Sequence, residues 1–315
     1  LFRVASASGL SLPRLPSQPP RMSSTPRAGE WVSPITASFI TTAGVGLDGI
    51  TCGPAGELFW IEGRPNEGGR YVCVRHSPHD PHASERCAVD VNPPNTNVRT
   101  RVHEYGGKSF LVADDPFDSG GKVLYYVNFK DQRLYKVPAA PATTASESSD
   151  VQPVCLTPAS DEFPTDAFLR FADFCLDPTR KRLVCVCEDH SAGSSSSSSG
   201  GACPADAVVN TVVAVSLDGS GKLDVLASGK DFYASPRVSP DGTKLAFVCW
   251  DHPSMPWDDT ELVVQALNND DGGSRGGAGS QVTVAGQRRE YGGGSGGSGG
   301  GGGASVLQPA WNPAT

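Results

Sequence analysis

The feature that most constrains the fold is a turn followed by a short apolar stretch, which occurs four times at nearly constant spacing. The four stretches begin 65, 60 and 62 residues apart. Each follows a turn rich in Gly, Pro, Asp or Ser, and each is followed by a further β-forming stretch. The apolar stretches are 57–62 (ELFWIE), 122–128 (KVLYYVN), 182–188 (RLVCVCE) and 244–250 (KLAFVCW).

A unit of about four short strands that recurs at a fixed period is typical of a β-propeller blade. The period exceeds the roughly 40–45 residues of the commonest propeller repeat, and polar insertions account for the excess. An irregular β-sandwich is the alternative, because it also has short strands and regular turns. The recurrence of the same turn and strand favours the propeller.

We therefore predict an all-β fold, a partial β-propeller of about four four-stranded blades plus the start of a fifth, with disordered Gly/Ser-rich insertions. Residues 281–285 (QVTVA) are expected to form the outer strand of the fourth blade. Residues 304–315 resemble 233–242 begun again, so we expect the chain to be a fragment of a longer protein. The propeller is predicted over 31–291, with blades at about 44–92, 103–157, 169–227 and 232–285, and a Gly-rich linker at 292–303.

Three low-complexity or polar segments are too poor in apolar residues to offset the entropy of ordering them. We interpret them as disordered insertions. They are 139–150, 192–201 and 272–303 apart from a short island.

The first 30 residues are expected to lie outside the fold. Residues 1–29 contain four arginines, six serines, five prolines and no acidic residue. This composition is typical of an organellar transit peptide, and an untargeted disordered tail is the alternative. Met22 is a possible start, which leaves open whether 1–21 are translated. The expected location is the plastid stroma or the cytoplasm.

The formal net charge is −8 and no cluster of Lys and Arg occurs, which argues against a nucleic-acid partner. The apolar runs are far shorter than the ~20 residues of a membrane helix, so no membrane partner is expected. Nine cysteines include no C-x-x-C pair, so neither a metal site nor a cofactor is predicted. Cys185 and Cys187 share a strand face at a poor distance for a disulfide, which favours a reducing compartment.

Two charged segments supply the candidate residues of a substrate channel. Residues 62–70 (EGRPNEGGR) form either a solvated hairpin loop or a connector that points charge into a central channel. In 97–107 (NVRTRVHEYGG), alternation places Arg99, Arg101 and His103 on one face of an expected strand. These groups either pair with acids between blades or orient an anionic ligand. The candidates are Glu62, Arg64, Arg70, Arg99, Arg101, His103 and Glu104.

An Asp-His pair follows two of the apolar stretches, at Asp189-His190 and at Asp251-His252. Equivalent pairs in successive repeats favour a structural tie within each blade over a catalytic dyad. The serine-hydrolase pattern G-x-S-x-G also occurs, at 272–276, 293–297 and 296–300. No strand precedes these matches and no helix follows them, so they are chance matches and no catalytic residue is assigned.

Several segments resemble, in order, the amino-terminal propeller of the prolyl oligopeptidase family of serine peptidases. The acylaminoacyl-peptidase and dipeptidyl-aminopeptidase-like members are the most similar. The resemblance covers about 31–264 and 305–313. Its segments are 62–70, 97–107, 128–137 (NFKDQRLYKV), 188–190 (EDH), 208–219 (VVNTVVAVSLDG) and 231–264, which contains SPDGTKLAFVCWDH.

This resemblance implies a seven- or eight-bladed propeller on a carboxy-terminal α/β-hydrolase domain with a Ser-Asp-His triad. The propeller would restrict the site to short peptides and could bind their amino end. The hydrolase domain is missing from this sequence, so the chain alone is predicted to be inactive. The expected partners are peptide substrates and that hydrolase domain. The alternative is a non-enzymatic propeller that binds proteins and is completed by oligomerisation or by a partner chain.

Overall fold

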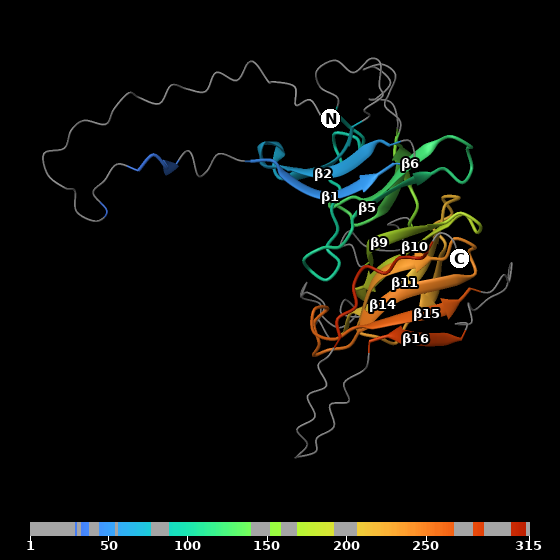
Figure 1. Cartoon of the computed structure of the whole chain (residues 1–315). Helices are drawn as coiled ribbons and strands as arrows, with labels where there is room; N and C mark the ends of the chain where they lie inside the picture. Colours follow the sequence, from blue (N-terminus) through green and yellow to red (C-terminus); the bar gives the residue numbers. More distant parts are fainter. Residues whose placement is uncertain are drawn as a thin grey trace, which may run out of the picture. The chain divides into compact units, whose positions relative to one another are not determined.

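The computed structural model describes the sheets of the chain and part of the segments that join them. Contacts divide the chain into Leu1–Ala43 and Gly44–Thr315, and every strand that the structure describes lies in the second unit (Figure 1). The predicted tail, the predicted insertions and the Gly-rich linker fall almost entirely outside the described residues. These are 29, 33–37, 44–53, 56–76, 88–139, 152–158, 169–191, 207–267, 280–286 and 304–312.

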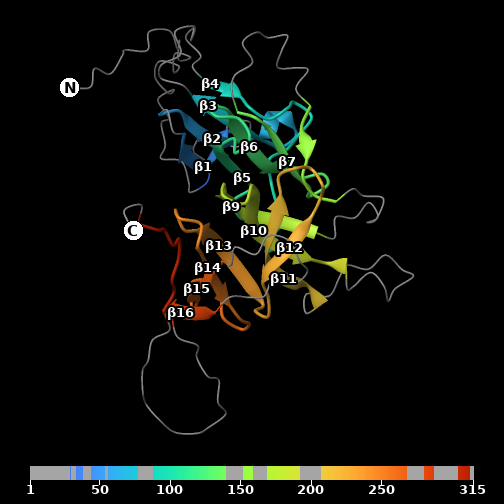
Figure 2. The same ribbon diagram turned by 90° about the vertical axis from the view of Figure 1, so that its right-hand side faces the viewer.

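The described strands form four antiparallel sheets of four strands, each built from consecutive segments of the chain (Figures 1 and 2). The first contains β1 (Gly46–Cys52), β2 (Leu58–Arg64), β3 (Arg70–His76) and β4 (Ala88–Asp90). The second contains β5 (Phe110–Asp114), β6 (Lys122–Val127), β7 (Leu134–Pro138) and β8 (Val154–Cys155). The third contains β9 (Leu169–Asp177), β10 (Arg182–Asp189), β11 (Val209–Ser216) and β12 (Leu223–Ala227). The fourth contains β13 (Phe232–Val238), β14 (Lys244–Trp250), β15 (Glu261–Ala266) and β16 (Gln281–Ala285).

The all-β fold of four four-stranded units is confirmed. The four apolar stretches are the second strands β2, β6, β10 and β14, which pair on both edges. β6, β10 and β14 are buried on both faces, which explains why they are continuously apolar instead of alternating. In β2, buried residues alternate with half-buried ones. The prediction for 281–285 is also confirmed, because β16 pairs with β15. In the described part of the chain, no helix is both long enough and apolar enough to span a membrane.

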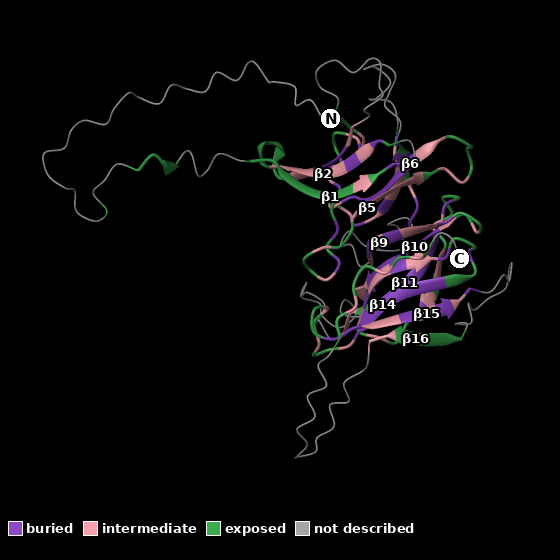
Figure 3. Cartoon of the chain, viewed as in Figure 1, coloured by how far each residue is buried: buried purple, intermediate pink, exposed green. Residues whose placement is uncertain are grey.

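The sheets pack face to face through three apolar clusters, each between neighbours in the chain. Phe59 and Tyr126 are among the residues that join the first sheet to the second. Tyr125 and Cys185 belong to the cluster between the second and third sheets, and Val186 and Phe247 to the one between the third and fourth. The strands β6, β10 and β14 are largely buried, whereas β1, β4 and β16 are largely exposed (Figure 3). Side chains of β10 therefore serve two interfaces, one from each face.

The first strands carry a repeated irregularity. In β1, β9 and β13 the register slips by a bulge, and one residue of each bulge adopts a left-handed conformation. These residues are Gly49 (φ 59°), Asp173 (φ 59°) and Ser235 (φ 52°). A bulge bends a strand and increases its twist, so the first strands turn at the same point in three sheets.

The segment 304–312 repeats the start of the fourth sheet. Gln308 has φ 52°, as Ser235 does, and each is followed by proline. Trp311 Nε1 donates to the carbonyl of Arg237 at 2.9 Å, and Val306 N donates to Thr260 Oγ1 at 2.6 Å. The segment thus lies along the fourth sheet in the position of the next blade's first strand.

Candidate functional site

The topology gathers the candidate residues at one end of the sheets. In every sheet the second strand ends where the first strand begins, because the two are antiparallel neighbours. Arg64 is the last residue of β2, and Asp189 the last of β10. The connector 97–107 reaches the same end of the third sheet through His103, whose N–H donates to Glu188 Oε1 at 2.7 Å. We call this end of the sheets the connector end.

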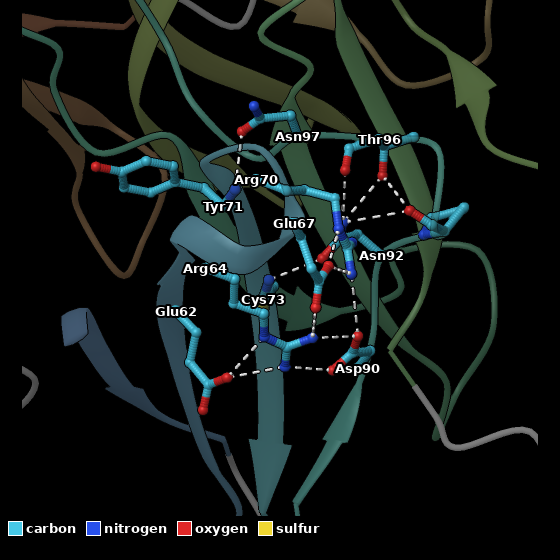
Figure 4. A network of polar contacts seen from close by, with 11 residues as sticks. Glu62, Arg64, Glu67, Arg70, Tyr71, Cys73, Asp90, Asn92, Thr96 and Asn97 are labelled. Carbon is cyan, nitrogen blue, oxygen red and sulfur yellow. Dashed lines mark hydrogen bonds and ion pairs between the residues drawn. The ribbon is translucent and has the colours of Figure 1, made fainter. Parts of the chain in front are cut away.

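In the first sheet, the charged hairpin 62–70 forms a closed network (Figure 4). The Arg64 guanidinium binds both oxygens of Asp90 at 2.7 and 2.8 Å and lies 2.8 Å from Glu62. Arg70 pairs with Glu67 at 2.6 Å. The hydrogen bonds to Asp90 hold the pKa of Arg64 above its ordinary value, and those of Arg70 lower the pKa of Glu67. Both arginines are paired with carboxylates, as is typical of a surface hairpin.

Beyond the end of β4, asparagine side chains accept the hydrogen bonds that β3 would otherwise donate to a neighbouring strand. Asn92 Oδ1 accepts from the Cys73 N–H at 2.7 Å, and Asn97 Oδ1 accepts from the Tyr71 N–H at 3.0 Å (Figure 4). The Asn97 N–H in turn donates to Asn128 Oδ1, at 3.1 Å. These bonds fix the path of the chain from the first sheet into the second.

The connector 97–107 is not a strand, and the prediction that Arg99, Arg101 and His103 share one face is wrong. Only Val98 forms a β-bridge, and residues 102–105 form a turn. His103 (φ 56°) and Glu104 (φ 65°) are left-handed, so the two-residue alternation of a strand fails. The physical reason is that the N–H groups of Arg101 and His103 donate to the side chains of Gln132 and Glu188 instead of to a strand edge.

Arg99 and Arg101 lie together over aromatic rings. The Cζ of Arg99 is 5.2 Å from the ring centre of Tyr71 and 4.9 Å from that of Phe129. The Cζ of Arg101 is 4.5 Å from the centre of Phe129. Both are cation–π distances. The interpretation of these two side chains as ion pairs between blades has no support among the described residues, where no salt bridge includes either.

His103 and Glu104 diverge from this pair. His103 packs between Tyr105, Phe232 and Trp250, with ring centres 5.5–5.8 Å apart. Burial lowers its pKa, and Glu188 and Asp173 oppose this shift only in part. Glu104 instead points to β9, where it pairs with Arg170 at 2.6 Å. An ion pair between blades, one of the two roles considered, is therefore present for Glu104.

The two Asp-His pairs make different contacts although they occupy equivalent positions. Asp189 Oδ1 accepts from the Ser191 N–H at 2.8 Å, and His190 Nε2 lies 3.1 Å from Glu188 Oε2. Asp251 instead accepts from Lys230 Nζ at 2.9 Å. The His252 N–H donates to Asp231, at 2.8 Å. The pairs close two different polar networks, and the geometry includes no shared dyad.

Three polar residues that organise this end, two of them buried, were missed by the sequence reasoning. Glu188 is 3 % exposed, Gln132 is 1 % exposed, and Asp173 joins β9 to β13 and to the segment that leads into β5. For Glu188 the signal in the sequence was its place as a charged residue at the end of a continuous apolar stretch, RLVCVCE. In the part of the chain that the structure describes, no group of three or more His, Cys, Asp or Glu is placed to hold a metal ion.

Comparison with solved structures finds similar propeller-containing peptidases. A puromycin-hydrolysing peptidase of Mycobacterium tuberculosis is 32 % identical with a TM-score of 0.65, and the match covers 82 % of this chain and 35 % of that one. A puromycin hydrolase is 30 % identical with a TM-score of 0.61 over 81 % of this chain and 34 % of its own. A variant of puromycin hydrolase in complex with PGG gives a TM-score of 0.62 at 30 % identity, with the same coverage of both chains. No family model matches the sequence, and a search of curated proteins finds no match. The chain spans about a third of the length of the structures it matches.

Proposed function

This chain is a propeller portion of the prolyl oligopeptidase family of peptidases, and we propose that it restricts which peptides reach the catalytic centre of a longer serine peptidase. The observation that supports this most directly is the match with puromycin-hydrolysing peptidases at 30–32 % identity over four fifths of the chain. A ring of sheets lets short, flexible peptides pass along its axis and excludes folded proteins.

The side chains of the connector end fit this role. They include charged and aromatic groups that are held in place by hydrogen bonds from neighbouring sheets. Arg99 and Arg101 are exposed, while His103 and Glu188 brace the backbone behind them. A filter needs this combination, because exposed groups select ligands only when their backbone is fixed. Glu62 pairs with Arg64, and Arg70 pairs with Glu67, so we assign Glu62, Arg64 and Arg70 a supporting role.

Catalysis belongs to the hydrolase domain in this proposal. Acyl transfer by a serine peptidase needs a nucleophile, a base and an oxyanion hole in one site. We assign none of these roles to a residue of the propeller, so this chain alone is expected to hydrolyse nothing. Its proposed partners are short peptides and a carboxy-terminal α/β-hydrolase domain, and its proposed location is the plastid stroma or the cytoplasm.

The proposal is tested by reading the transcript beyond the codon of Thr315 and by labelling the native product with a fluorophosphonate. We expect a G-x-S-x-G motif between a strand and a helix, and a labelled serine within it. The 315-residue chain should give no turnover of aminoacyl or acylaminoacyl chromogenic peptides. A stop codon directly after this segment, together with soluble oligomers of defined size, would contradict the proposal and favour a binding propeller.

A further inference from the structure

We propose that Arg99 and Arg101 form a binding site for the carboxylate of a peptide. The inference rests on the proposed function, since it names the class of peptide that the filter prefers. The same planar group occurs at the carboxy terminus of a peptide and in the side chains of Asp and Glu. The site is therefore defined by the carboxylate, and the experiment separates the two sources.

The first argument is that the two guanidinium groups share one aromatic platform. Both lie within 5 Å of the ring centre of Phe129, and Arg99 also lies over Tyr71. Stacking on a ring orients a guanidinium and leaves the N–H groups of its edge free to donate. Each arginine therefore offers N–H donors to a planar anion from a position over the Phe129 ring.

The second argument is that hydrogen bonds fix the backbone of Phe129 and of both arginines. Gln132 Oε1 accepts from the Arg101 N–H at 2.8 Å, and Gln132 Nε2 donates to the carbonyl of Phe129 at 2.9 Å. The Arg99 N–H donates to the carbonyl of Val127, at 3.2 Å. The Gln132 side chain, which is 1 % exposed, thus ties the backbone of Phe129 to that of Arg101. Such prior fixation reduces the entropy lost on binding.

The third argument is that the positive charge of this pair is not neutralised within the described residues. No described carboxylate lies within 4.0 Å of either guanidinium, although the chain has a net charge of −8. Both side chains are exposed, so an anion can reach them. Six other arginines, by contrast, form salt bridges with carboxylates: Arg64, Arg70, Arg75, Arg170, Arg180 and Arg182.

An arginine fork binds a carboxylate through two parallel N–H···O bonds, which gives direction as well as charge. A peptide that enters with its carboxylate on this pair is held by that end. Replacing the carboxylate with an amide removes the charge and one acceptor. We expect this replacement to weaken binding at least about tenfold, the factor that corresponds to the loss of about 1.4 kcal/mol.

The test is a titration of the ¹⁵N-labelled 315-residue chain, followed through the Nε–Hε signals of its arginines. One pair of probes is acetyl-trialanine with a free carboxylate and its amide. The other pair is acetyl-Ala-Glu-Ala-amide and acetyl-Ala-Gln-Ala-amide. The R99Q/R101Q variant removes the site. The K222Q/K244Q variant is the matched control, because it removes the same charge from exposed lysines at the opposite end of the sheets.

We expect at least one probe with a carboxylate to shift the signals of Arg99 and Arg101, while its neutral counterpart binds at least about tenfold more weakly. The pair that responds identifies the source of the carboxylate. The shifts should vanish in R99Q/R101Q and persist in K222Q/K244Q. Equal binding of charged and neutral probes to the parent chain overturns the inference, as does an equal loss in both variants.

The comparison of probes on the parent chain decides the question even if R99Q/R101Q fails to fold. An R99K/R101K variant, which keeps the charge and loses the fork, should bind the carboxylate probes with intermediate affinity. The titration involves no catalysis, so its outcome is independent of the fluorophosphonate test. The titration detects the carboxylate site even if no hydrolase domain follows the propeller. The fluorophosphonate label detects a hydrolase domain even if this site is absent.

Discussion

Asp173 Oδ2 in β9 accepts a hydrogen bond from the backbone N–H of Ser235 in β13, at 2.9 Å. The other oxygen, Oδ1, accepts from the N–H of Lys108, which precedes β5, also at 2.9 Å. The Asp173 N–H donates back to the carbonyl of Lys108. One side chain at a bulge therefore joins β9 to β13 and to the segment that leads into β5. This connection depends on the left-handed conformation of Asp173, which directs the carboxylate between its neighbours.

We predict that D173A destabilises the 315-residue chain by about 2–4 kcal/mol, because two backbone donors lose their acceptor. D173N should cost about half as much, since asparagine keeps one acceptor oxygen and tolerates a left-handed conformation. Urea unfolding followed by circular dichroism measures both. D224A is the control, because Asp224 is a half-exposed partner of Lys222 and its loss should cost below about 1 kcal/mol. Equal effects of D173A and D224A would refute the linking role of Asp173.

Glu188 provides a second prediction, for the tie between the connector and the third sheet. Its carboxylate accepts from the His103 N–H at 2.7 Å and lies 3.1 Å from His190 Nε2. E188A should destabilise the chain by about 2–4 kcal/mol, since it leaves a buried donor unpaired. E104A removes an exposed partner of Arg170 and should cost below about 1 kcal/mol. The same unfolding measurement applies, and a larger effect of E104A would contradict this account.

The burial of His103 predicts a pH dependence of stability. Burial lowers the pKa of His103 in the folded state, so the unfolded chain binds a proton more readily below the ordinary value of about 6.5. The contribution of neutral His103 is complete above that pH and is lost as the pH falls. We therefore expect Tm to decrease between pH 7.5 and pH 5.5, and to decrease less in H103F. Scanning calorimetry at both pH values measures this.

The control for His103 is H252F, which replaces an exposed histidine. Its Tm should fall between the two pH values as much as that of the parent chain. If H103F and the parent chain lost the same Tm between pH 7.5 and pH 5.5, the pH dependence would have to come from other groups.

The cysteines give a prediction of differential reactivity. Burial raises the pKa of the Cys185 and Cys187 thiols, and a buried thiol with a raised pKa is inert. Cys52 is exposed. With iodoacetamide at pH 8, peptide-level mass spectrometry should find Cys52 modified more than about tenfold faster than either. In 8 M urea the three rates should converge. Rapid labelling of Cys185 in the folded chain would show that the cluster between the second and third sheets is not formed.

The sequence alone was sufficient to predict the second strand of each sheet. β6, β10 and β14 are covered on both faces, so their residues must be apolar without interruption, and turn residues mark where each begins. The same reasoning located β16 and the repeat of β13 at 304–312. These features are local, because each of these strands pairs with strands that are close to it in the chain.

The connector 97–107 was decided by tertiary structure. Its alternating pattern predicted a strand, but the Arg101 N–H bonds to Gln132 and the His103 N–H to Glu188, which lie 31 and 85 residues away. A periodic pattern describes side chains on one element and contains no information about acceptors on another sheet. The pairing of the hairpin around Arg64 depends in the same way on Asp90, which lies 26 residues away. Composition and turns thus determined the strands, whereas the positions of the charged groups followed from hydrogen bonds that form only when the sheets are packed.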